Sequence, residues 1–410
     1  MSRNAKRQSL ADTRVLKPYG RARLAVRSAC LVGAVVLLWP GLAAASLSVL
    51  VPALSPFVAL AVLVAARTLP VAALVALVVG AAALVRRRFF CRSVCPVGLC
   101  LDGAGKLGRC WGRAPRPGVL WGQWIVLLTL GSACLGWPLL LWLDPLAIFA
   151  GVFDLSTRPV AAGAWLAATA FAVVFVLSVV WPNVWCGRIC PLGAFQDLLH
   201  QAPRRLRAAV GRRDDTHQGA DMGGLSRRAV LGVAAGAGSA GMLKLVRGQP
   251  RPVLRPPGAR DESDFVGLCT RCGNCLRACP SGIIRRDPGQ NGWASLLTPV
   301  LCFHDDYCRE DCTRCTQVCP TGALARLLPA DKTQMRLGLP RVDMDVCLLA
   351  DDRECSACAR WCPYDAIRYE FCETTYTLTP QIDAQKCTGC GACEAACPTT
   401  PNKAIVVCPA

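Results

Sequence analysis

Nineteen of the chain's 27 cysteines lie in its last 142 residues, in four groups that each end in Cys-Pro. The groups are Cys269, Cys272, Cys275 and Cys279; Cys308, Cys312, Cys315 and Cys319; Cys347, Cys355, Cys358 and Cys362; and Cys387, Cys390, Cys393 and Cys397. The first and last groups are unmodified CxxCxxCxxxCP and the middle two are variants. In ferredoxins of this spacing three thiolates hold one cubane, and the fourth ligates the cluster of the partner group. Sixteen thiolates therefore predict four [4Fe-4S] clusters.

Zinc and disulfides fit these spacings poorly. Zinc sites usually pair one CxxC with a distant second pair and lack the Cys-Pro ending, and adjacent CxxC pairs make poor cross-links. Cys302, Cys372 and Cys408 fall outside the pattern, with Cys302 an alternative ligand to Cys308. Short apolar stretches follow each Cys-Pro, but large apolar side chains are few. We therefore expect an α+β ferredoxin-like domain that depends on its clusters for folding.

The first 200 residues have a different character, with long runs of Ala, Val and Leu. Four segments approach the roughly 20 apolar residues that a bilayer core requires. They are residues 29–46, 69–85, 119–143 and 159–181. This pattern predicts a four-span α-helical membrane bundle in contact with lipid.

Basic residues flank these apolar runs. Residues 1–27 and 86–117 each carry eight Lys or Arg against one acid, and 188–228 carry eight against four. By the positive-inside rule these three regions are cytoplasmic. The apolar stretch 47–66 is then expected to be a re-entrant or interfacial element, since a further span would place the second basic loop outside. Because the +19 net charge is spread over such flanks, we do not expect nucleic-acid binding.

This half contains an internal repeat. "FFCRSVCPVGLCLD" and "VWCGRICPLGAFQD" share Cys-x3-Cys-Pro-x-Gly-x3-Asp at an offset of 95 residues. "LSPF" and "LDPL", at residues 54–57 and 143–146, match more loosely. The thiolates of Cys91, Cys95, Cys186 and Cys190 suffice for one further [4Fe-4S] cluster, and ligation by Cys100 or Cys110 would make two. Buried structural cysteines are the alternative.

Haem is not expected. The chain has three histidines, His200, His217 and His304, none of them in an expected span, and it has no CxxCH motif. Electrons would therefore move through iron and sulfur alone.

A twin-arginine pattern lies past the middle of the chain, in residues 225–246. Arg227 and Arg228 precede an apolar run rich in small residues, which is typical of an export signal for folded cargo. The run also contains a GxGxxG pattern, but no strand precedes it, so a nucleotide loop is not expected. Residues 229–246 are long enough to cross a bilayer as a fifth, uncleaved helix.

We therefore expect five regions. They are a basic cytoplasmic tail (1–24), a four-span membrane domain (25–200), a cytoplasmic linker (201–224), a twin-arginine signal helix (225–248) and a polyferredoxin domain (249–410).

These motifs resemble a known set of proteins. "RPPGARDESDFVGLCTRCGNCLRACP" and the groups after it are similar to the polyferredoxins NapG and MauM, and the unit with two CxxxCPxG motifs resembles NapH, MauN and the membrane part of NosR. The resemblance implies a fusion of the two in the bacterial inner membrane, with the N-terminus cytoplasmic and the ferredoxin domain periplasmic. It implies oxidation of membrane quinol and delivery of electrons to a periplasmic oxidoreductase or c-type cytochrome. It further implies that the first cysteine group pairs with the fourth and the second with the third.

Three hypotheses follow. The chain is a quinol dehydrogenase module or electron carrier, an accessory redox protein for maturation of a metalloenzyme, or a protein whose clusters are all cytoplasmic, with 229–246 as a surface helix. We assign no catalytic or quinone-binding residue. Phe57, Trp142 and Asp144 are interpreted as interfacial anchors and turn residues near the outer face.

Overall fold

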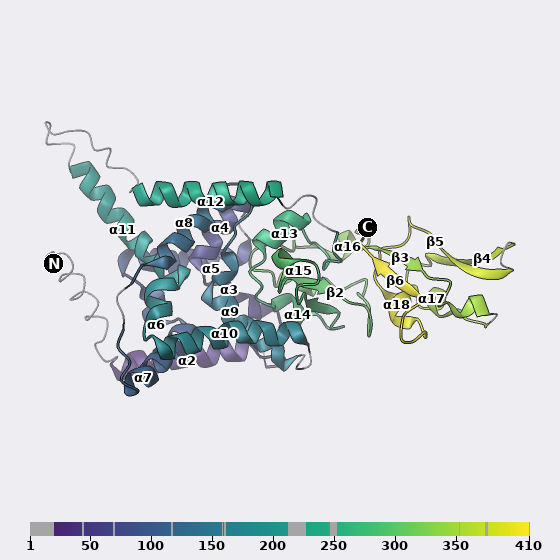
Figure 1. Ribbon diagram of the computed structural model, residues 1–410, viewed down its shortest axis with the longest axis horizontal. Coiled ribbons are helices and arrows are strands. Elements are labelled where there is room, and N and C mark those ends of the chain that lie inside the picture. The colour runs from purple at the N-terminus through teal and green to yellow at the C-terminus, as the bar shows by residue number, and fades with distance from the viewer. Residues whose placement is uncertain are drawn as a thin grey trace.

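The computed structural model describes residues 20–42, 45–68, 70–115, 118–157, 159, 161–211, 227–246, 252–351, 353–373 and 376–409. The expected basic tail and cytoplasmic linker lie largely outside the described residues. A helical half, residues 20–246, and a cluster half, residues 252–409, lie end to end along the long axis of the molecule (Figure 1).

The helical half is built from two copies of one pattern. The first copy comprises α2 (Arg21–Leu38), η2 (Ala45–Val49), α3 (Leu50–Ala53), α4 (Pro56–Ala66), η3 (Val71–Ala73), α5 (Leu74–Val85), α6 (Phe89–Ser93) and α7 (Pro96–Cys110). The second comprises α8 (Trp121–Ala133), η4 (Leu141–Leu143), α9 (Pro145–Val152), η5 (Phe153–Ser156), α10 (Ala162–Val180), the π-helical turn η6 (Trp185–Ile189) and α11 (Pro191–Gly211). Helix α7 packs on α10 and α11 packs on α5. The two copies therefore interlock into one bundle.

A short helix in each copy starts inside the bundle, at the loosely matched "LSPF" and "LDPL". Ser55 caps α4, and Asp144 caps α9 by accepting from the backbone N–H of Leu146 at 3.0 Å. The Ser55 hydroxyl donates to Asp144 Oδ2 at 2.5 Å, and both residues are buried. The loose match thus marks equivalent positions that meet in the interior.

This placement corrects the interpretation of these residues as outer-face anchors. Phe57 and Asp144 are each 0% exposed. Trp142 is 38% exposed, but the guanidinium of Arg271 lies over its ring, 5.2 Å from the centroid. Phe57 and Asp144 therefore lie inside the bundle, and Trp142 lies at its contact with the cluster half.

Two helices of the described chain are long and apolar enough to cross a membrane, not the four or five that the apolar runs predict. They are Ala162–Val180 and Ala229–Val246, the latter within α12 (Arg227–Val246). Residues 46–66 form two helices bent by 96°, which are either a broken span or the re-entrant loop predicted for this stretch. Helices α5 and α8, with 12 and 13 residues, are shorter than the apolar runs that contain them. For example, α8 ends at Ala133, because Gly136 adopts a left-handed conformation and Pro138 follows.

Helix α12 packs along α8, and glycines make this close approach possible. A Cβ atom on Gly131 would collide with the backbone oxygen of Val233, and one on Gly236 with that of Leu128. Small residues at such contacts let helix backbones approach closely. The GxGxxG pattern is therefore part of a packed helix, as expected, and not a nucleotide loop.

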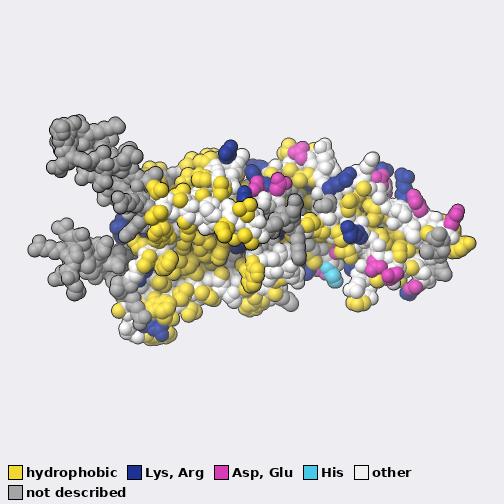
Figure 2. Space-filling model, turned by 45° about the horizontal axis from the view of Figure 1, so that its top comes forward, with side chains coloured by type: hydrophobic (Ala, Val, Ile, Leu, Met, Phe, Trp, Pro, Cys, Tyr) yellow, Lys and Arg dark blue, Asp and Glu magenta, His cyan; other side chains and the backbone are white. Residues whose placement is uncertain are grey.

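The surfaces of the two halves differ in chemistry. In Figure 2 the visible face of the helical half is largely hydrophobic, whereas Lys, Arg, Asp and Glu gather on the cluster half. Exposed aliphatic side chains on the helices include Val36, Leu77, Val78, Val173 and Val176. Apolar side chains in contact with solvent at this density are characteristic of a lipid- or protein-facing surface.

The cluster half consists of short elements. Its helices are α13 (Glu262–Leu268), α14 (Asn274–Ala278), α15 (Arg314–Gln317), α16 (Pro329–Lys332), α17 (Ala357–Arg360) and α18 (Ala392–Ala396), with single turns η8 (Trp293–Ser295) and η9 (Leu348–Asp351). Its strands form three antiparallel pairs: β1 (Ile284–Arg286) with β2 (Pro299–Leu301), β3 (Leu339–Val342) with β6 (Ile405–Cys408), and β4 (Ile367–Cys372) with β5 (Thr377–Ile382). Strands β1, β4 and β6 each follow a Cys-Pro, which matches the expected ferredoxin pattern.

Candidate iron–sulfur sites

The first and second cysteine groups share their thiols. A cavity in this pair is lined by Cys269, Cys272, Cys275 and Cys319, which we name site 1. Burial, together with the nearby thiols of Cys272 and Cys319, raises the pKa of Cys269 to about 11. Cys279, the last cysteine of the first group, lies close enough to Cys308 and Cys315 to raise the pKa of each, although burial is the larger cause. It is therefore placed with the cysteines of the second group. Site 2 therefore comprises Cys279, Cys308, Cys312 and Cys315.

The third and fourth groups share thiols in the same way. Site 3 is a cavity lined by Cys347, Cys355, Cys358 and Cys397. Cys362 lies close enough to Cys387 and Cys390 to raise the pKa of each, although burial is the larger cause. Site 4 therefore comprises Cys362, Cys387, Cys390 and Cys393.

The pairing of first with fourth and second with third group, implied by the resemblance, is therefore wrong for this chain. The structure pairs first with second and third with fourth. Helix α14 packs on α15 and α17 packs on α18, so each pair is built from groups that are neighbours in sequence. Cys308 itself lies in site 2, so the alternative ligand Cys302 is not needed; its backbone N–H donates to Ile283.

The chemistry of the donor set fits iron–sulfur cubanes. Backbone N–H groups point at the sulfur of the Cys before Pro: Leu324 donates to Cys319 Sγ and Ala366 to Cys362 Sγ, each at 3.4 Å. Such hydrogen bonds stabilise metal-bound thiolates. Among the described residues no three His, Cys, Asp or Glu side chains lie close enough to hold a single metal ion. A cubane spaces its thiolates more widely, because each binds a different iron atom.

The helical half has its own thiol cluster, site 5, formed by Cys91, Cys95, Cys186 and Cys190. Each of these thiols is close enough to others of the set to act on them electrostatically. Cys95 caps α7 by accepting from the N–H of Gly98 at 3.4 Å, and Cys190 accepts from Gly193 at 3.5 Å. The Cys-Pro-x-Gly repeat is therefore a helix start at which sulfur caps the first turn.

Arginines surround site 5. Each repeat copy ends in an Asp that is paired with arginine: Arg27 with Asp102 at 2.7 Å, and Arg88 with Asp197 at 2.6 Å. Arg88 also donates to the carbonyl of Cys186 at 3.0 Å. These guanidinium groups would offset the negative charge of thiolate-bound iron. Of the two extra candidates, Cys100 lies near Arg27 and Cys110 is exposed.

Site 5 and site 1 lie at opposite ends of the bundle. Helix α10 starts at Ala162, next to the cluster half where Gly163 contacts Arg286, and η6 with Cys186 follows its far end. Its 19 residues correspond to about 28 Å. The intervening interior holds the Ser55–Asp144 pair.

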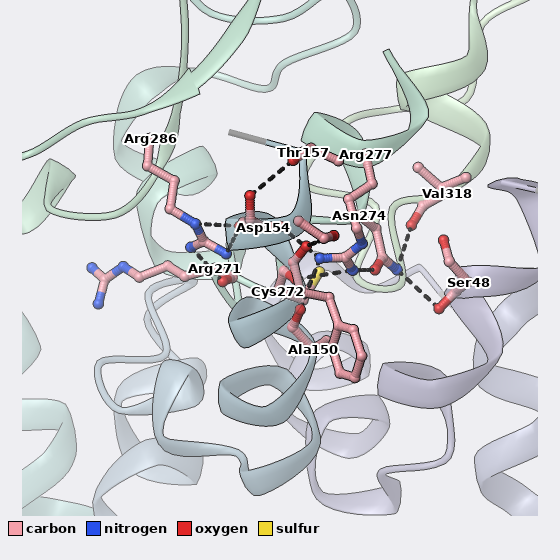
Figure 3. Close-up of polar contacts among 12 residues, drawn as sticks. Ser48, Ala150, Asp154, Thr157, Arg271, Cys272, Asn274, Arg277, Arg286 and Val318 are labelled. Carbon is pink, nitrogen blue, oxygen red and sulfur yellow. Dashed lines mark hydrogen bonds and ion pairs between the residues drawn. The ribbon is translucent and has the colours of Figure 1, made fainter. Parts of the chain in front are cut away.

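A buried ion cluster joins the two halves (Figure 3). The Asp154 carboxylate, in η5, accepts from Arg277 Nη1 at 2.6 Å and from Arg286 Nε at 2.5 Å. Arg277 also donates to the carbonyl of Ala150 at 2.8 Å. Three side chains that are each at most 4% exposed thus bridge the helical half and the cluster half.

The ion cluster bears directly on site 1. Gly273, between two ligands of that site, lies against the Asp154 carboxylate, and a Cβ there would collide with both of its oxygens. Beside it, Asn274 donates to the carbonyl of Ser48 at 3.2 Å. Asp154, Arg277 and Arg286 were not among the residues singled out from the sequence. The one available signal was an Asp within the largely apolar loop between the third and fourth expected spans.

Comparison with protein-family models supports the class of protein. A model described as a 4Fe-4S binding domain matches residues 68–114 and 163–209, the two repeat copies. A model described as a 4Fe-4S dicluster domain matches residues 268–323 and 353–400, the two interlocked pairs. The fold and its thiol sites define a multi-cluster ferredoxin-type iron–sulfur protein.

Individual relatives narrow this class. "Methylamine utilization ferredoxin-type protein MauM" of Methylobacillus flagellatus is 40% identical over 187 residues, which are 42% of this chain and 76% of the relative. "Ferredoxin-type protein NapG" of Escherichia coli is 38% identical over 35% of this chain and 65% of the relative, and "Ferredoxin-type protein NapF" of the same organism is 34% identical over 36% and 81%. The chain belongs to this family of ferredoxin-type proteins. No solved structure matches it.

Proposed function

We propose that this chain is a membrane-bound electron-transfer protein that passes electrons from membrane quinol to a soluble redox protein on the periplasmic side. In this proposal site 5 lies at the cytoplasmic end of the bundle and sites 1 to 4 lie outside. The helical half corresponds to the NapH, MauN and NosR type of membrane iron–sulfur protein, fused to the NapG and MauM type of ferredoxin.

Several observations support a membrane position. Two apolar helices are long enough to span, and exposed aliphatic side chains cover the helical half. The basic segments flank the end that carries site 5, which the positive-inside rule assigns to the cytoplasm. Helix α12 runs alongside the bundle from that end towards the cluster half (Figure 1). A twin-arginine helix in this position would carry the folded ferredoxin across.

The observation that carries the proposal is the buried ion cluster of Asp154, Arg277 and Arg286. A carboxylate and two guanidinium groups withdrawn from water are costly unless their geometry holds them together. Their contact holds site 1 against the helical half. Site 5 and sites 1 to 4 would therefore belong to a single electron-transfer path. Two independent domains on a tether would not bury such charges between them.

The residues of this chain have separable tasks. Bound clusters would supply one-electron chemistry. The thiols of sites 1 to 5, which are buried or half-buried, would hold the iron, and Arg27 and Arg88 would offset negative charge at site 5. One cluster in the helical half is proposed, since Cys110 is exposed and the charged group that acts on Cys100 is Arg27.

Quinol-driven reduction of the purified full chain in lipid nanodiscs tests the proposal. Five clusters correspond to roughly 20 iron atoms per chain. We expect a short-chain quinol to reduce them, with the reduction followed by absorbance and electron paramagnetic resonance. Cys91→Ser should remove about four iron atoms and abolish reduction by quinol, while dithionite still reduces sites 1 to 4. The exposed Cys110→Ser is the matched control.

Clusters that stay oxidised with every quinol tested, while dithionite reduces them, would contradict the proposal. The accessory role in metalloenzyme maturation would then be favoured. A phosphatase reporter after Ala410 tests the topology, because it is active only outside the cytoplasm.

A further inference from the structure

The four sites of the cluster half form a line. Site 1 lies against the helical half at Asp154, and sites 1 and 2 exchange ligands between their groups. The Cys308 N–H of site 2 donates to the Cys390 carbonyl of site 4 at 2.9 Å. Sites 4 and 3 again exchange ligands. The order is therefore 1, 2, 4, 3, and site 3 is the end farthest from the helical half.

An apolar face continues from site 3 to the tip of the molecule. In the β4–β5 hairpin Phe371 pairs with Leu378 and Tyr369 pairs with Pro380, so these four side chains share one face of the sheet. Pro380 lines the site 3 cavity, and the Tyr369 hydroxyl lies 3.3 Å from Cys358 Sγ. The face leads directly from the cysteines to the surface.

The outer part of this face has no partner in the described chain that covers it. Phe371 is 58% exposed, Tyr376 is 78% exposed and Leu378 is 46% exposed. The two aromatic rings contact each other edge to face at 6.3 Å. We name Phe371, Tyr376 and Leu378 the hairpin patch. In Figure 1 the hairpin projects at the end opposite the helical half.

The surroundings of the hairpin patch are acidic, although the whole chain is strongly basic. Residues 343–410 contain ten Asp and Glu against five Lys and Arg, while the chain as a whole carries +19. Glu370 and Glu373 flank Phe371 and are exposed. Thiolate-bound clusters would add further negative charge. A partner with a basic rim would be attracted to this end, and one with an acidic rim would be repelled.

We propose that the hairpin patch is the docking surface for a soluble, basic one-electron redox protein, which exchanges electrons with site 3. This inference rests on the proposed function and specifies the class of its partner. The step moves one electron from the reduced cluster at site 3 to the oxidised metal centre of the partner, with no bond made and no proton transferred. A small apolar contact inside a charged rim suits an interface that must form and separate quickly.

Stopped-flow oxidation of the full chain in nanodiscs tests this, with mitochondrial cytochrome c as a basic probe. The chain is first reduced with dithionite and freed of excess reductant, so the result is independent of quinol. We expect the second-order rate constant of the Phe371→Ser/Tyr376→Ser variant to fall about tenfold or more, since exposed aromatic anchors dominate such contacts. The control Trp293→Ser, at a side chain of η8 that is 90% exposed, should keep the full rate.

Charge provides a second readout. Raising the ionic strength should slow the reaction of the unaltered chain, and it should slow the Glu370→Lys/Glu373→Lys variant less. Succinylated cytochrome c, whose lysines carry carboxylates, should react more slowly than the native probe. Iron content and resonance spectra must be unchanged in every variant.

Equal rates for the serine variant and the Trp293 control would overturn the proposal, as would equal rates for the two forms of cytochrome c. A chain that sediments as a dimer, and becomes a monomer in the serine variant without loss of rate, would show that the hairpin patch binds a second copy instead. If quinol fails to reduce the chain while these rate differences persist, the proposed function fails and the docking surface stands.

Discussion

Replacing Asp154 by Asn tests whether the buried ion cluster holds the two halves in register. The carboxylate pairs with Arg277 and Arg286, whose side chains are 4% and 2% exposed. Removing one partner of a buried ion pair costs about 3–5 kcal/mol. Each arginine keeps carbonyl partners, Ala150 for Arg277 and Arg271 for Arg286, so we expect the lower end of this range. About 3 kcal/mol corresponds to a loss of roughly 100-fold in the docking equilibrium.

The expected consequence is loosened docking with intact clusters. Hydrogen–deuterium exchange should rise in segments 145–157 and 271–286, and reduction of sites 1 to 4 by quinol should slow, while the iron content stays unchanged. Asp305→Asn is the matched control, because Asp305 pairs with Arg285 at the surface, where an ion pair contributes at most about 1 kcal/mol. Identical exchange in the two variants would refute the reasoning.

Further predictions concern packing, pairing and iron. Gly236→Leu should lower the melting temperature of the helical half, since its side chain would collide with the α8 backbone, whereas Gly238→Leu, at a position with open space, should not; equal melting temperatures would contradict the α8–α12 packing. Cys319→Ser combined with Cys269→Ser should lose no more iron than either change alone, because both belong to site 1, whereas Cys319→Ser with Cys312→Ser should lose about twice as much. A twofold loss in both double variants would restore the rejected pairing. Removal of iron by a chelator should unfold the cluster half and leave the helical half folded, as circular dichroism in the near and far ultraviolet would show. In the unfolded metal-free cluster half the thiols keep the ordinary Cys pKa of about 8.5, so they are mostly protonated at pH 7, and binding of iron must release their protons. Reconstitution should therefore be faster at pH 9 than at pH 7, and a rate independent of pH would contradict this.

Cysteine spacing can predict which thiols form one group, because that part of the chemistry is local. In the first and last groups, three thiols within seven residues can only wrap a cluster beside them. The structure adds that the Cys-Pro-x-Gly repeat marks equivalent helix starts after Cys95 and Cys190. Pairing between groups depends on how α14 meets α15 and how α17 meets α18. The spacing says nothing about those contacts, and the relation carried over from other polyferredoxins failed.

Contacts between residues far apart in the sequence could not be predicted, for a different reason. Asp154 pairs with Arg277 and Arg286 across more than 120 residues of sequence, and no local sequence pattern around either arginine indicates such a partner. The same holds for Ser55 and Asp144, whose loose sequence match became meaningful only when both proved to cap helices inside the bundle. The apolar runs also predicted more membrane spans than the described chain has helices long and apolar enough to form them. Hydropathy alone does not show where a helix ends, as α8 does before Gly136.

The central claim is that one path runs from the bundle through sites 1, 2, 4 and 3 to a soluble acceptor. Steady-state reduction of external mitochondrial cytochrome c by quinol, catalysed by the full chain in sealed proteoliposomes, tests it most directly. We predict turnover with the unaltered chain and with Cys110→Ser, and none with Cys91→Ser at site 5 or Cys358→Ser at site 3. Full turnover in either of the latter two variants, or none in the unaltered chain with all five clusters assembled, would contradict the account.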